Sequence, residues 1–526
     1  MATANAEEKT DPPPDPHNLI KRTVSLSGFR LNKASFPALV LVGCVRYRLI
    51  ILVVLRFLPM PTSSRPPLSA PQTTLKKDCL TFPEVIAQSI GTVAPSVTPA
   101  VIVGSIFAVA GNGTWLAFVF GMIALLFLAG SLNVFTRRIA VSGGIYVYIT
   151  ESLGPIAGVI AGWSHMIAYF FGGAFCIVGL TNIASSLMQP TLGIEKSGLL
   201  SSAVAVVSLG IAWWLAYRDI KLSSRVTLIL ESTTLTLILI LIVLHFVHKG
   251  SLIDPSQIHL ENVKIDDLRV GLALVFLAFG GFECVSTLGA EAQKPKTSTP
   301  RAVITSIIFL AFIFIVSSYG LVDTFHGLDP SLDKADAPLT ILAHTVGADT
   351  LGVLVAIGVL ASFFASILAC INALGRILHT LSHCGLFHSA AQKIHKQHAT
   401  PHVGVTVAAV GMLLLPLLLA VGGASYSDSM NYLGTISAFG YLAAYLLLAL
   451  GAPFYLKRRG ELRLWHIVSA LITVLLLGIP IFGNLYPVPA WPLNLLPYIF
   501  LGLLAVNVGY LLYVRCVNPD RLKNIH

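Results

Sequence analysis

The chain has 526 residues, of which 55% are hydrophobic and only 11% are charged, and its mean hydropathy is +0.81. This composition lies far from that of soluble domains and excludes a soluble globular protein. The formal net charge is +10 at pH 7, but the basic residues are spread over many short segments, so we expect no nucleic acid partner. The composition predicts an integral membrane protein.

Apolar runs of roughly 18 to 25 residues, long enough to cross a bilayer as helices, recur along the chain. The first six lie at 82–110, 115–135, 154–187, 199–217, 226–247 and 270–288. The second six lie at 303–322, 353–381, 403–421, 432–455, 465–482 and 493–514. The sequence therefore predicts an all-α membrane protein with twelve transmembrane helices.

The first 75 residues differ from this core. Positions 1–35 are Pro-rich and polar, which is typical of disorder. Residues 36–60 are apolar but contain three arginines, and each would cost roughly 2.5–3.5 kcal/mol near the middle of a span. A segment lying on the membrane surface is favoured over a thirteenth span, and a start codon set too far upstream is a further alternative. We expect a cytoplasmic extension at 1–75, a twelve-helix core at 76–516 and a cytoplasmic tail at 517–526.

Basic residues also predict the orientation of the core. They gather after even-numbered spans, as in Arg137-Arg138 and Lys457-Arg458-Arg459. Because short cytoplasmic loops carry the excess of Lys and Arg, both ends of the core are expected in the cytoplasm, in a cytoplasmic or plasma membrane.

Two spans contain residues that interrupt a helix. The first reads Gly91-Thr92-Val93-Ala94-Pro95-Ser96, and proline removes a backbone donor and clashes with the preceding turn. The sixth contains Gly280-Gly281, followed by Glu283. Paired breaks at corresponding places in two halves of a chain predict a transport site at the bilayer midplane. Freed amides suit an anionic group and freed carbonyls suit an ammonium group, so the site fits a zwitterion such as an amino acid.

These residues resemble a known family. The segment Ser142-Gly143-Gly144-Ile145-Tyr146-Val147-Tyr148, followed by Gly154-Pro155 and Gly162-Trp163, is similar to the region between the second and third spans of amino acid-polyamine-organocation permeases. The run Phe279-Gly280-Gly281-Phe282-Glu283, with Glu291, Pro295, Pro300 and Arg301, resembles the sixth-span signature of that family. The resemblance covers roughly residues 76–516. It implies the leucine-transporter-like five-plus-five inverted repeat with broken first and sixth helices, alternating access, and an amino acid or related amine as the substrate.

The resemblance also implies which residues contact the substrate. The backbone of Gly91, Thr92 and Val93 would hold its carboxylate. Phe279, Gly280 and Gly281 would face its ammonium group and gate the pocket. His165 lies where some relatives carry an aromatic residue of the substrate pocket. The alternative is that His165 is a structural residue of the core. The first-span match is imperfect, because many relatives have a Gly-Ser/Ala-Gly run where this chain has Thr92-Val93-Ala94.

Coupling to an ion is predicted from buried polar groups. Some proton-coupled relatives carry a lysine in the fifth span, whereas this chain has Glu231 within Leu230-Glu231-Ser232. Ionisable groups inside a span are functional candidates, so Glu231 and Glu283 are the predicted proton carriers, with a neutral packing role as the alternative. Sodium coupling is the alternative to proton coupling, with the hydroxyls of Ser362 and Ser366 as ligands of the sodium ion.

Three classes of function compete. A secondary transporter, proton-coupled and without a cofactor or structural metal, is favoured by the paired breaks. Its alternatives are a sodium symporter and an amino acid or amine exchanger. A sensor without net transport would use the same pocket. A membrane enzyme is disfavoured, because the chain has no HExxH pair, Gly-x-Ser-x-Gly elbow or phosphate loop.

Overall fold

The computed structural model describes residues 77–192, 198–335, 337–486 and 491–517. The predicted extension at 1–75 and the tail beyond Val517 lie outside these ranges. The described residues form helices and contain no β-strand, with one isolated bridge between Leu80 and Ala292. The predicted all-α class is confirmed.

Eleven segments of the described chain are long and apolar enough to cross a membrane. The first, Phe82–Thr136, takes in both of the first two predicted spans. The total of twelve spanning helices therefore stays a prediction. This segment is divided into α2 (Phe82–Val93), the π-helical turn η2 (Thr98–Ile102), α3 (Val103–Ala110), η3 (Gly111–Gly113) and α4 (Thr114–Thr136).

The other long helices match the remaining predicted spans in order. They are α6 (Pro155–Leu192), α7 (Gly198–Arg218), α8 (Ile220–Lys249), α10 (Ile265–Ala278) with the 3₁₀ helix η4 (Phe282–Leu288), α11 (Pro295–Thr324), α13 (Asp349–His383), α14 (His402–Val421), α15 (Tyr426–Arg458), α16 (Leu464–Gly483) and α17 (Leu496–Val517). Several extend beyond their predicted apolar runs, because polar residues continue the helix at its ends; α8, for example, begins where Asp219 accepts a hydrogen bond from the Lys221 amide.

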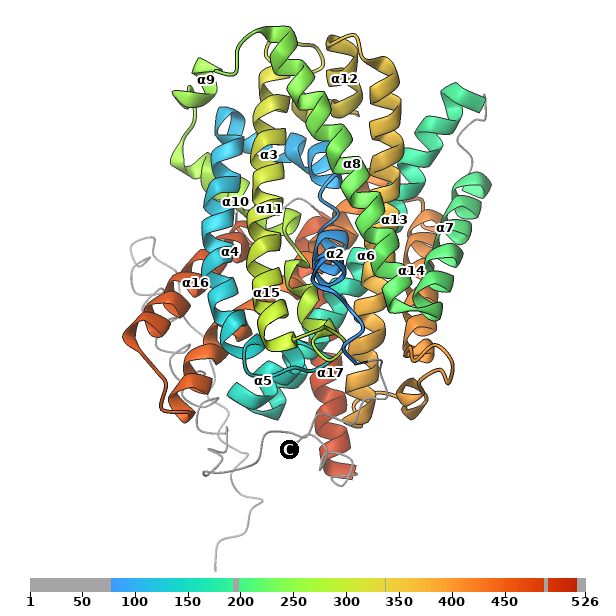
Figure 1. The fold of residues 1–526 in the computed structure, drawn as a ribbon, viewed down its shortest axis with the longest axis vertical. Helices are drawn as coiled ribbons and strands as arrows, with labels where there is room; N and C mark the ends of the chain where they lie inside the picture. The colour runs from blue at the N-terminus through green and yellow to red at the C-terminus, as the bar shows by residue number, and fades with distance from the viewer. Residues whose placement is uncertain (1–76, 193–197, 336, 487–490, 518–526) are drawn as a thin grey trace, which may run out of the picture. The chain divides into compact units, whose positions relative to one another are not determined.

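Short helices that the hydropathy pattern did not predict lie at the two ends of the bundle. They are α5 (Ile145–Leu153), α9 (Pro255–Ile258) and α12 (Pro338–Thr345), with the 3₁₀ turns η5 (Leu332–Lys334), η6 (Ser389–Gln392) and η7 (Leu493–Leu495). Helices α9 and α12 lie at one end and α5 at the opposite end (Figure 1). None of them is long enough to cross a bilayer.

The interruption after α2 has a local cause. Ala94 adopts a left-handed conformation with φ of 52° and its N–H bonds to the Ile90 carbonyl, which closes the helix. Pro95 follows and has no N–H with which to continue it. The helix resumes at Thr98 as a π-helical turn.

The interruption after α10 depends on glycine. Helix α10 ends at Ala278, and Gly281 takes a φ of 99°, which side chains with a Cβ rarely adopt. The chain then enters η4, which carries Glu283 in its first turn.

The half-helices pack as crossed pairs. Helix α2 lies against η4, whereas α3 lies against α10 and η5. Around α2 stand α8, α11 and α13, and α6 packs along both α13 and α15. Figure 1 shows α2 in the middle of the bundle with α16 at its margin. The two interruptions are thereby brought together inside the protein.

Candidate functional site

The two helix interruptions are joined by direct contacts. Ser89 Oγ donates to the Phe282 carbonyl at 2.5 Å, and Gln88 Nε2 contacts Cys284 Sγ at 3.3 Å. A Cβ on Gly281 would collide with the side chain of Thr92. The absence of a side chain at Gly281 is therefore what allows the two segments to approach so closely.

A cavity lies beside this junction. It encloses about 530 Å³ of space between atoms, including the part continuous with solvent. Its walls come from the end of α2, η2, α6, α10, α13 and α15. The lining residues are Thr92, Val93, Ala94, Val97, Ile102, Gly172, Phe175, Cys176, Leu277, Ala278, Gly280, Ser366, Cys370, Gly434, Ser437 and Tyr441.

Some predicted substrate contacts line this cavity and some do not. Thr92, Val93 and Gly280 are part of its wall, whereas Gly91 and Gly281 are not. Gly91 faces the side chain of Thr227, and Gly281 faces Thr92.

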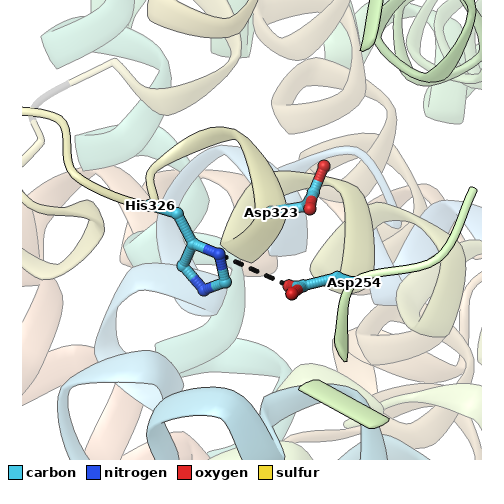
Figure 2. A group of neighbouring side chains, drawn as sticks. All are labelled: Asp254, Asp323 and His326. Atoms are coloured by element: carbon cyan, nitrogen blue, oxygen red, sulfur yellow. Dashed lines mark ion pairs between the residues drawn. The ribbon is translucent and has the colours of Figure 1, made fainter. Parts of the chain in front are cut away.

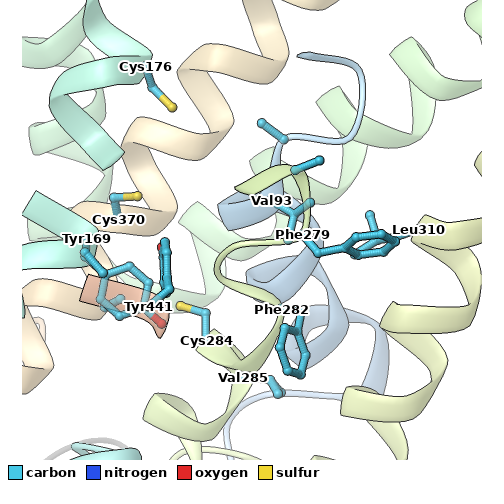
Figure 3. Close-up of a cluster of buried hydrophobic side chains, with 14 of the residues drawn as sticks. Val93, Tyr169, Cys176, Phe279, Phe282, Cys284, Val285, Leu310, Cys370 and Tyr441 are labelled. Carbon is cyan, nitrogen blue, oxygen red and sulfur yellow. The ribbon is translucent and has the colours of Figure 1, made fainter. Parts of the chain in front are cut away.

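Phe279 also lies away from the cavity wall. Figure 3 shows its ring pointing towards Leu310 and away from Tyr441. Its centroid is 4.9 Å from that of Phe314 and 6.4 Å from that of Phe118. In this conformation Phe279 is packed in the core, so a gating role would require its side chain to move.

Glu283 is the centre of a buried polar network. Its Oε1 accepts hydrogen bonds from His165 Nε2 at 2.6 Å and Tyr169 OH at 2.9 Å, and its Oε2 accepts one from Tyr445 OH. Gly281 N–H donates to the Tyr445 hydroxyl at 3.3 Å, which ties the network to the interruption after α10.

His165 therefore contacts a predicted proton carrier and does not line the cavity. Its side chain is 1% exposed, and its Nδ1 is buried without a hydrogen-bond partner. The tautomer with hydrogen on Nε2 satisfies the contact with Glu283. Tyr441 stands between the two regions, since it lines the cavity and its ring lies 5.6 Å from that of Tyr169.

Glu231 forms a second buried carboxylate site with the predicted sodium ligand Ser362. Ser362 Oγ donates to Glu231 Oε1 at 2.7 Å. Ser96 of the α2 interruption lies beside the same carboxylate. Neither Glu231 Oε2 nor Ser96 Oγ makes a hydrogen bond of regular geometry. A carboxylate buried in this way requires a proton or a cation to neutralise it.

Ser366 lies one helical turn further along α13 and contacts the first interruption. Its Oγ donates to the Thr92 carbonyl at 3.1 Å and accepts from Cys176 Sγ at 3.2 Å. Both predicted sodium ligands are thus already hydrogen-bonded to protein atoms. Both lie on α13, where Ser362 contacts Glu231 beside Ser96 and Ser366 contacts the Thr92 carbonyl.

A buried ion pair that the sequence reasoning missed lies further along α13. Arg376 donates through Nε and Nη2 to Glu291 at 2.5 and 2.9 Å, and both side chains are 1% exposed. The Glu291 carbonyl accepts from the amides of Cys79 and Leu80, just before α2. The available signal was an arginine inside an apolar span, which requires a buried partner.

A separate polar cluster joins α8, α9 and α11 at their shared end (Figure 2). The carboxylates of Asp254 and Asp323 and the ring of His326 lie within 4.8 Å of one another. Asp323 accepts from His245 at 2.7 Å and from Lys249. Asp254 pairs with His326 at 3.5 Å. Since protein donors already occupy these carboxylates, the cluster acts as a link between helices.

The fold and the cavity together define a class of protein. The described part of the structure has eleven segments long and apolar enough to cross a membrane, two helix interruptions that meet in the interior, and a small cavity at that junction. These are features of a multi-pass membrane transporter, where irregular backbone is tolerated because it lines a cavity.

Comparison with known proteins gives the family. Residues 80–510 match the family model described as amino acid permease. The chain belongs to this family, within the amino acid-polyamine-organocation permeases whose signature the sequence carries, and the family fits the leucine-transporter-like fold.

Several relatives are named as transporters of different substrates. The chain is 25% identical over 356 residues to the branched-chain amino acid permease BcaP of Bacillus subtilis (strain 168), a match of 64% of this chain and 74% of that protein. It is 26% identical over 357 residues to cationic amino acid transporter 4 of Mus musculus, covering 64% of this chain and 54% of the relative. It is 23% identical over 415 residues to the low-affinity putrescine importer PlaP of Escherichia coli (strain K12), covering 77% and 86%. The match thus spans about half of the mouse transporter.

Proposed function

We propose that this chain is a secondary active transporter that moves an amino acid or related amine across the membrane by alternating access. The observation that carries the proposal is the meeting of the two helix interruptions at the wall of one cavity, which Thr92, Val93 and Gly280 help to line. Membership of the amino acid permease family supports it. Named relatives move branched-chain amino acids, cationic amino acids or putrescine.

The proposed coupling ion is the proton. Glu283 and Glu231 are both buried. Glu283 lies in η4, directly after the α10 interruption, and Glu231 lies beside Ser96 of the α2 interruption. Glu283 is hydrogen-bonded to Tyr445, which also accepts from Gly281. Loss or gain of a proton at Glu283 would alter the same hydrogen bonds that hold the interruption after α10. This gives a physical link between proton binding and movement of a half-helix.

Sodium coupling is the second candidate, and a specific observation favours it. Glu231, Ser96 and Ser362 place oxygen atoms side by side, and two of these atoms lack a regular hydrogen bond. Hard cations bind such oxygen groups. The same buried carboxylate would hold a proton in one mechanism and help to hold sodium in the other. A sodium-coupled symporter, an exchanger and a non-transporting sensor are therefore outcomes of one experiment.

The test is uptake by purified full-length protein in liposomes, with radiolabelled amino acids and amines and an imposed inward gradient of protons or sodium. Proton-driven accumulation is expected. Accumulation that requires sodium would reject proton coupling, and exchange only against preloaded substrate would make the protein an exchanger. Saturable binding without any flux would indicate a sensor.

Two variants distinguish the carboxylates. Glu283→Gln and Glu231→Gln keep the side-chain size and remove the titratable group. We expect gradient-driven accumulation to fall by at least about tenfold in the variant that lacks the coupling carboxylate, while exchange of preloaded substrate persists, because exchange needs no net proton movement. Unchanged accumulation across pH in both variants would remove both residues from the mechanism.

A further inference from the structure

The cavity wall contains no charged side chain. Its sixteen lining residues include no Asp, Glu, Lys, Arg or His. Most of the wall is apolar, with aliphatic groups from Val93, Val97, Ile102 and Leu277 and the ring of Phe175. The named relatives differ in their substrates, so family membership alone does not identify the substrate of this chain. The lining of its own cavity is the remaining evidence on substrate chemistry.

Three of the four hydroxyl side chains in the wall are directed to the backbone, and the fourth belongs to Tyr441. Thr92 Oγ1 donates to the Gln88 carbonyl at 2.6 Å, and Ser437 Oγ donates to the Ala168 carbonyl at 2.8 Å. Ser366 Oγ donates to the Thr92 carbonyl. These hydroxyl hydrogens are already used, which leaves them poorly suited to recognise a polar substrate side chain.

The nearest carboxylates are turned away from the cavity. Glu283 is fully buried and is not part of the wall, since His165, Tyr169 and Tyr445 surround its two oxygens. Glu231 is bonded to Ser362 and lines a different, smaller space with Thr227 and Leu235. Neither carboxylate is placed to neutralise a cation inside the cavity.

We infer that the substrate side chain is neutral and apolar, and that this site discriminates against cationic amino acids and polyamines. This inference rests on the proposed transport function and names its substrate class. The polar ends of an amino acid would meet the backbone freed at the two interruptions, while its side chain would lie against α6, α13 and the end of α10. A cationic side chain placed there would lose its hydration without gaining a counter-charge.

The first test is competition in liposomes that contain purified full-length protein. Counterflow of radiolabelled leucine is measured against unlabelled valine, isoleucine, methionine, serine, lysine, arginine and putrescine. We expect the apolar amino acids to compete, and lysine, arginine and putrescine to be weaker by at least about 100-fold, because a buried ion without a partner costs several kcal/mol.

Three outcomes are distinguishable. Competition by apolar amino acids alone supports the inference. Lysine, arginine or putrescine competing as well as leucine would overturn it, while the proposed transport of amino acids and amines would stand. Uptake of no amino acid or amine would overturn the proposed function and this inference with it.

A pair of variants tests the physical cause. Cys370 is a residue of α13 in the cavity wall, and Figure 3 shows it between Cys176 and Tyr441. Cys370→Asp adds a carboxylate to the wall and should raise lysine uptake relative to leucine uptake by at least about tenfold. The matched variant Cys370→Ser makes the side chain polar at a similar size but adds no charge, so it should keep the preference for leucine over lysine. An unchanged lysine-to-leucine ratio in a folded Cys370→Asp protein would contradict the proposed cause.

Discussion

Gly281 illustrates how one residue serves both the fold and the site. Its φ of 99° is open to glycine, and a Cβ there would meet Thr92 and lie 3.2 Å from the Tyr441 hydroxyl. Both neighbours belong to the cavity wall. Any side chain at this position would therefore strain the backbone and push apart the segments that form the cavity.

Gly281→Ala should lower the free energy of unfolding by about 1–3 kcal/mol, because the alanine would have a strained backbone and would clash with Thr92. It should also abolish uptake, because the two segments that form the cavity would be pushed apart. Thermal unfolding in detergent and liposome uptake measure the two effects. Gly478→Ala is the control, since a Cβ there meets nothing within 4 Å. Normal uptake by Gly281→Ala would show that the close approach of the two segments is not required.

At the level of single residues, the sequence indicated which buried positions carry polar or ionisable groups, but not which side chains those groups contact. Glu231 and Ser362 were predicted as rival coupling groups, yet they are hydrogen-bonded to each other. His165 was predicted at the substrate and lies at Glu283, 118 positions away in the chain. Residue type and hydropathy are local properties, whereas a hydrogen-bond partner depends on how distant helices pack.

Among the described helices, the pair of Arg376 and Glu291 is a fully buried link with two hydrogen bonds between charged groups. It joins α13 to the segment after η4, and that segment in turn holds the residues before α2. The pair therefore stabilises the arrangement in which the cavity occurs.

Arg376→Met should destabilise the protein by about 3–5 kcal/mol, because it leaves the Glu291 carboxylate buried without its partner. The double variant Arg376→Met with Glu291→Gln should recover part of this loss. Arg138→Ala is a matched control in an exposed pair with Glu461, whose side chains are 30% and 42% exposed, and it should change stability by less than about 1 kcal/mol. Equal effects of the buried and exposed variants in thermal unfolding would contradict this reasoning.

The cluster around Asp254 should make the link between α8, α9 and α11 sensitive to acid. Burial raises the pKa of Asp254, but hydrogen bonds from Ser256 and Gln257 and the nearby charge of His326 outweigh it, so the pKa lies below its ordinary value of 3.8. A depressed carboxyl pKa stabilises the fold above the unfolded-state pKa, and this contribution is lost as pH falls below 3.8 through the folded-state value.

Asp254→Asn should therefore lower stability at pH 7 by about 1–3 kcal/mol, the usual contribution of hydrogen bonds to a charged group. The difference from the unsubstituted protein should shrink as the pH is lowered below 3.8, where Asp254 itself becomes neutral. The difference in Tm between the two proteins at neutral and acidic pH measures this. A difference that stays constant with pH would show that charge at Asp254 is unimportant.

At the scale of the whole molecule, the orientation of the helical core in the membrane can be tested. The distribution of Lys and Arg predicts that both ends of the core are cytoplasmic. Cys516, at the end of α17, is exposed, and the Asp266 side chain at the start of α10 is 88% exposed on a predicted outer loop. These two positions are therefore predicted to lie on opposite faces of the membrane.

A membrane-impermeant thiol reagent applied to intact cells should leave Cys516 unlabelled until the membrane is permeabilised. Asp266→Cys, combined with Cys516→Ser, should be labelled in intact cells. Labelling of a Cys516→Ser protein gives the background from the other cysteines. The reverse pattern would invert the predicted topology.

The sequence by itself determined that this is a helical membrane protein and where most spans lie, and it predicted interruptions in the first and the sixth span. Hydropathy and helix breaking act over one or two turns, so they can be read along the chain. The tertiary structure alone decided which predicted residues reach the cavity, that Glu283 is enclosed by three ring-bearing side chains, and that Arg376 pairs with Glu291. These features arise between residues far apart in sequence, because a buried polar group takes whichever partner the packing of the helices brings to it.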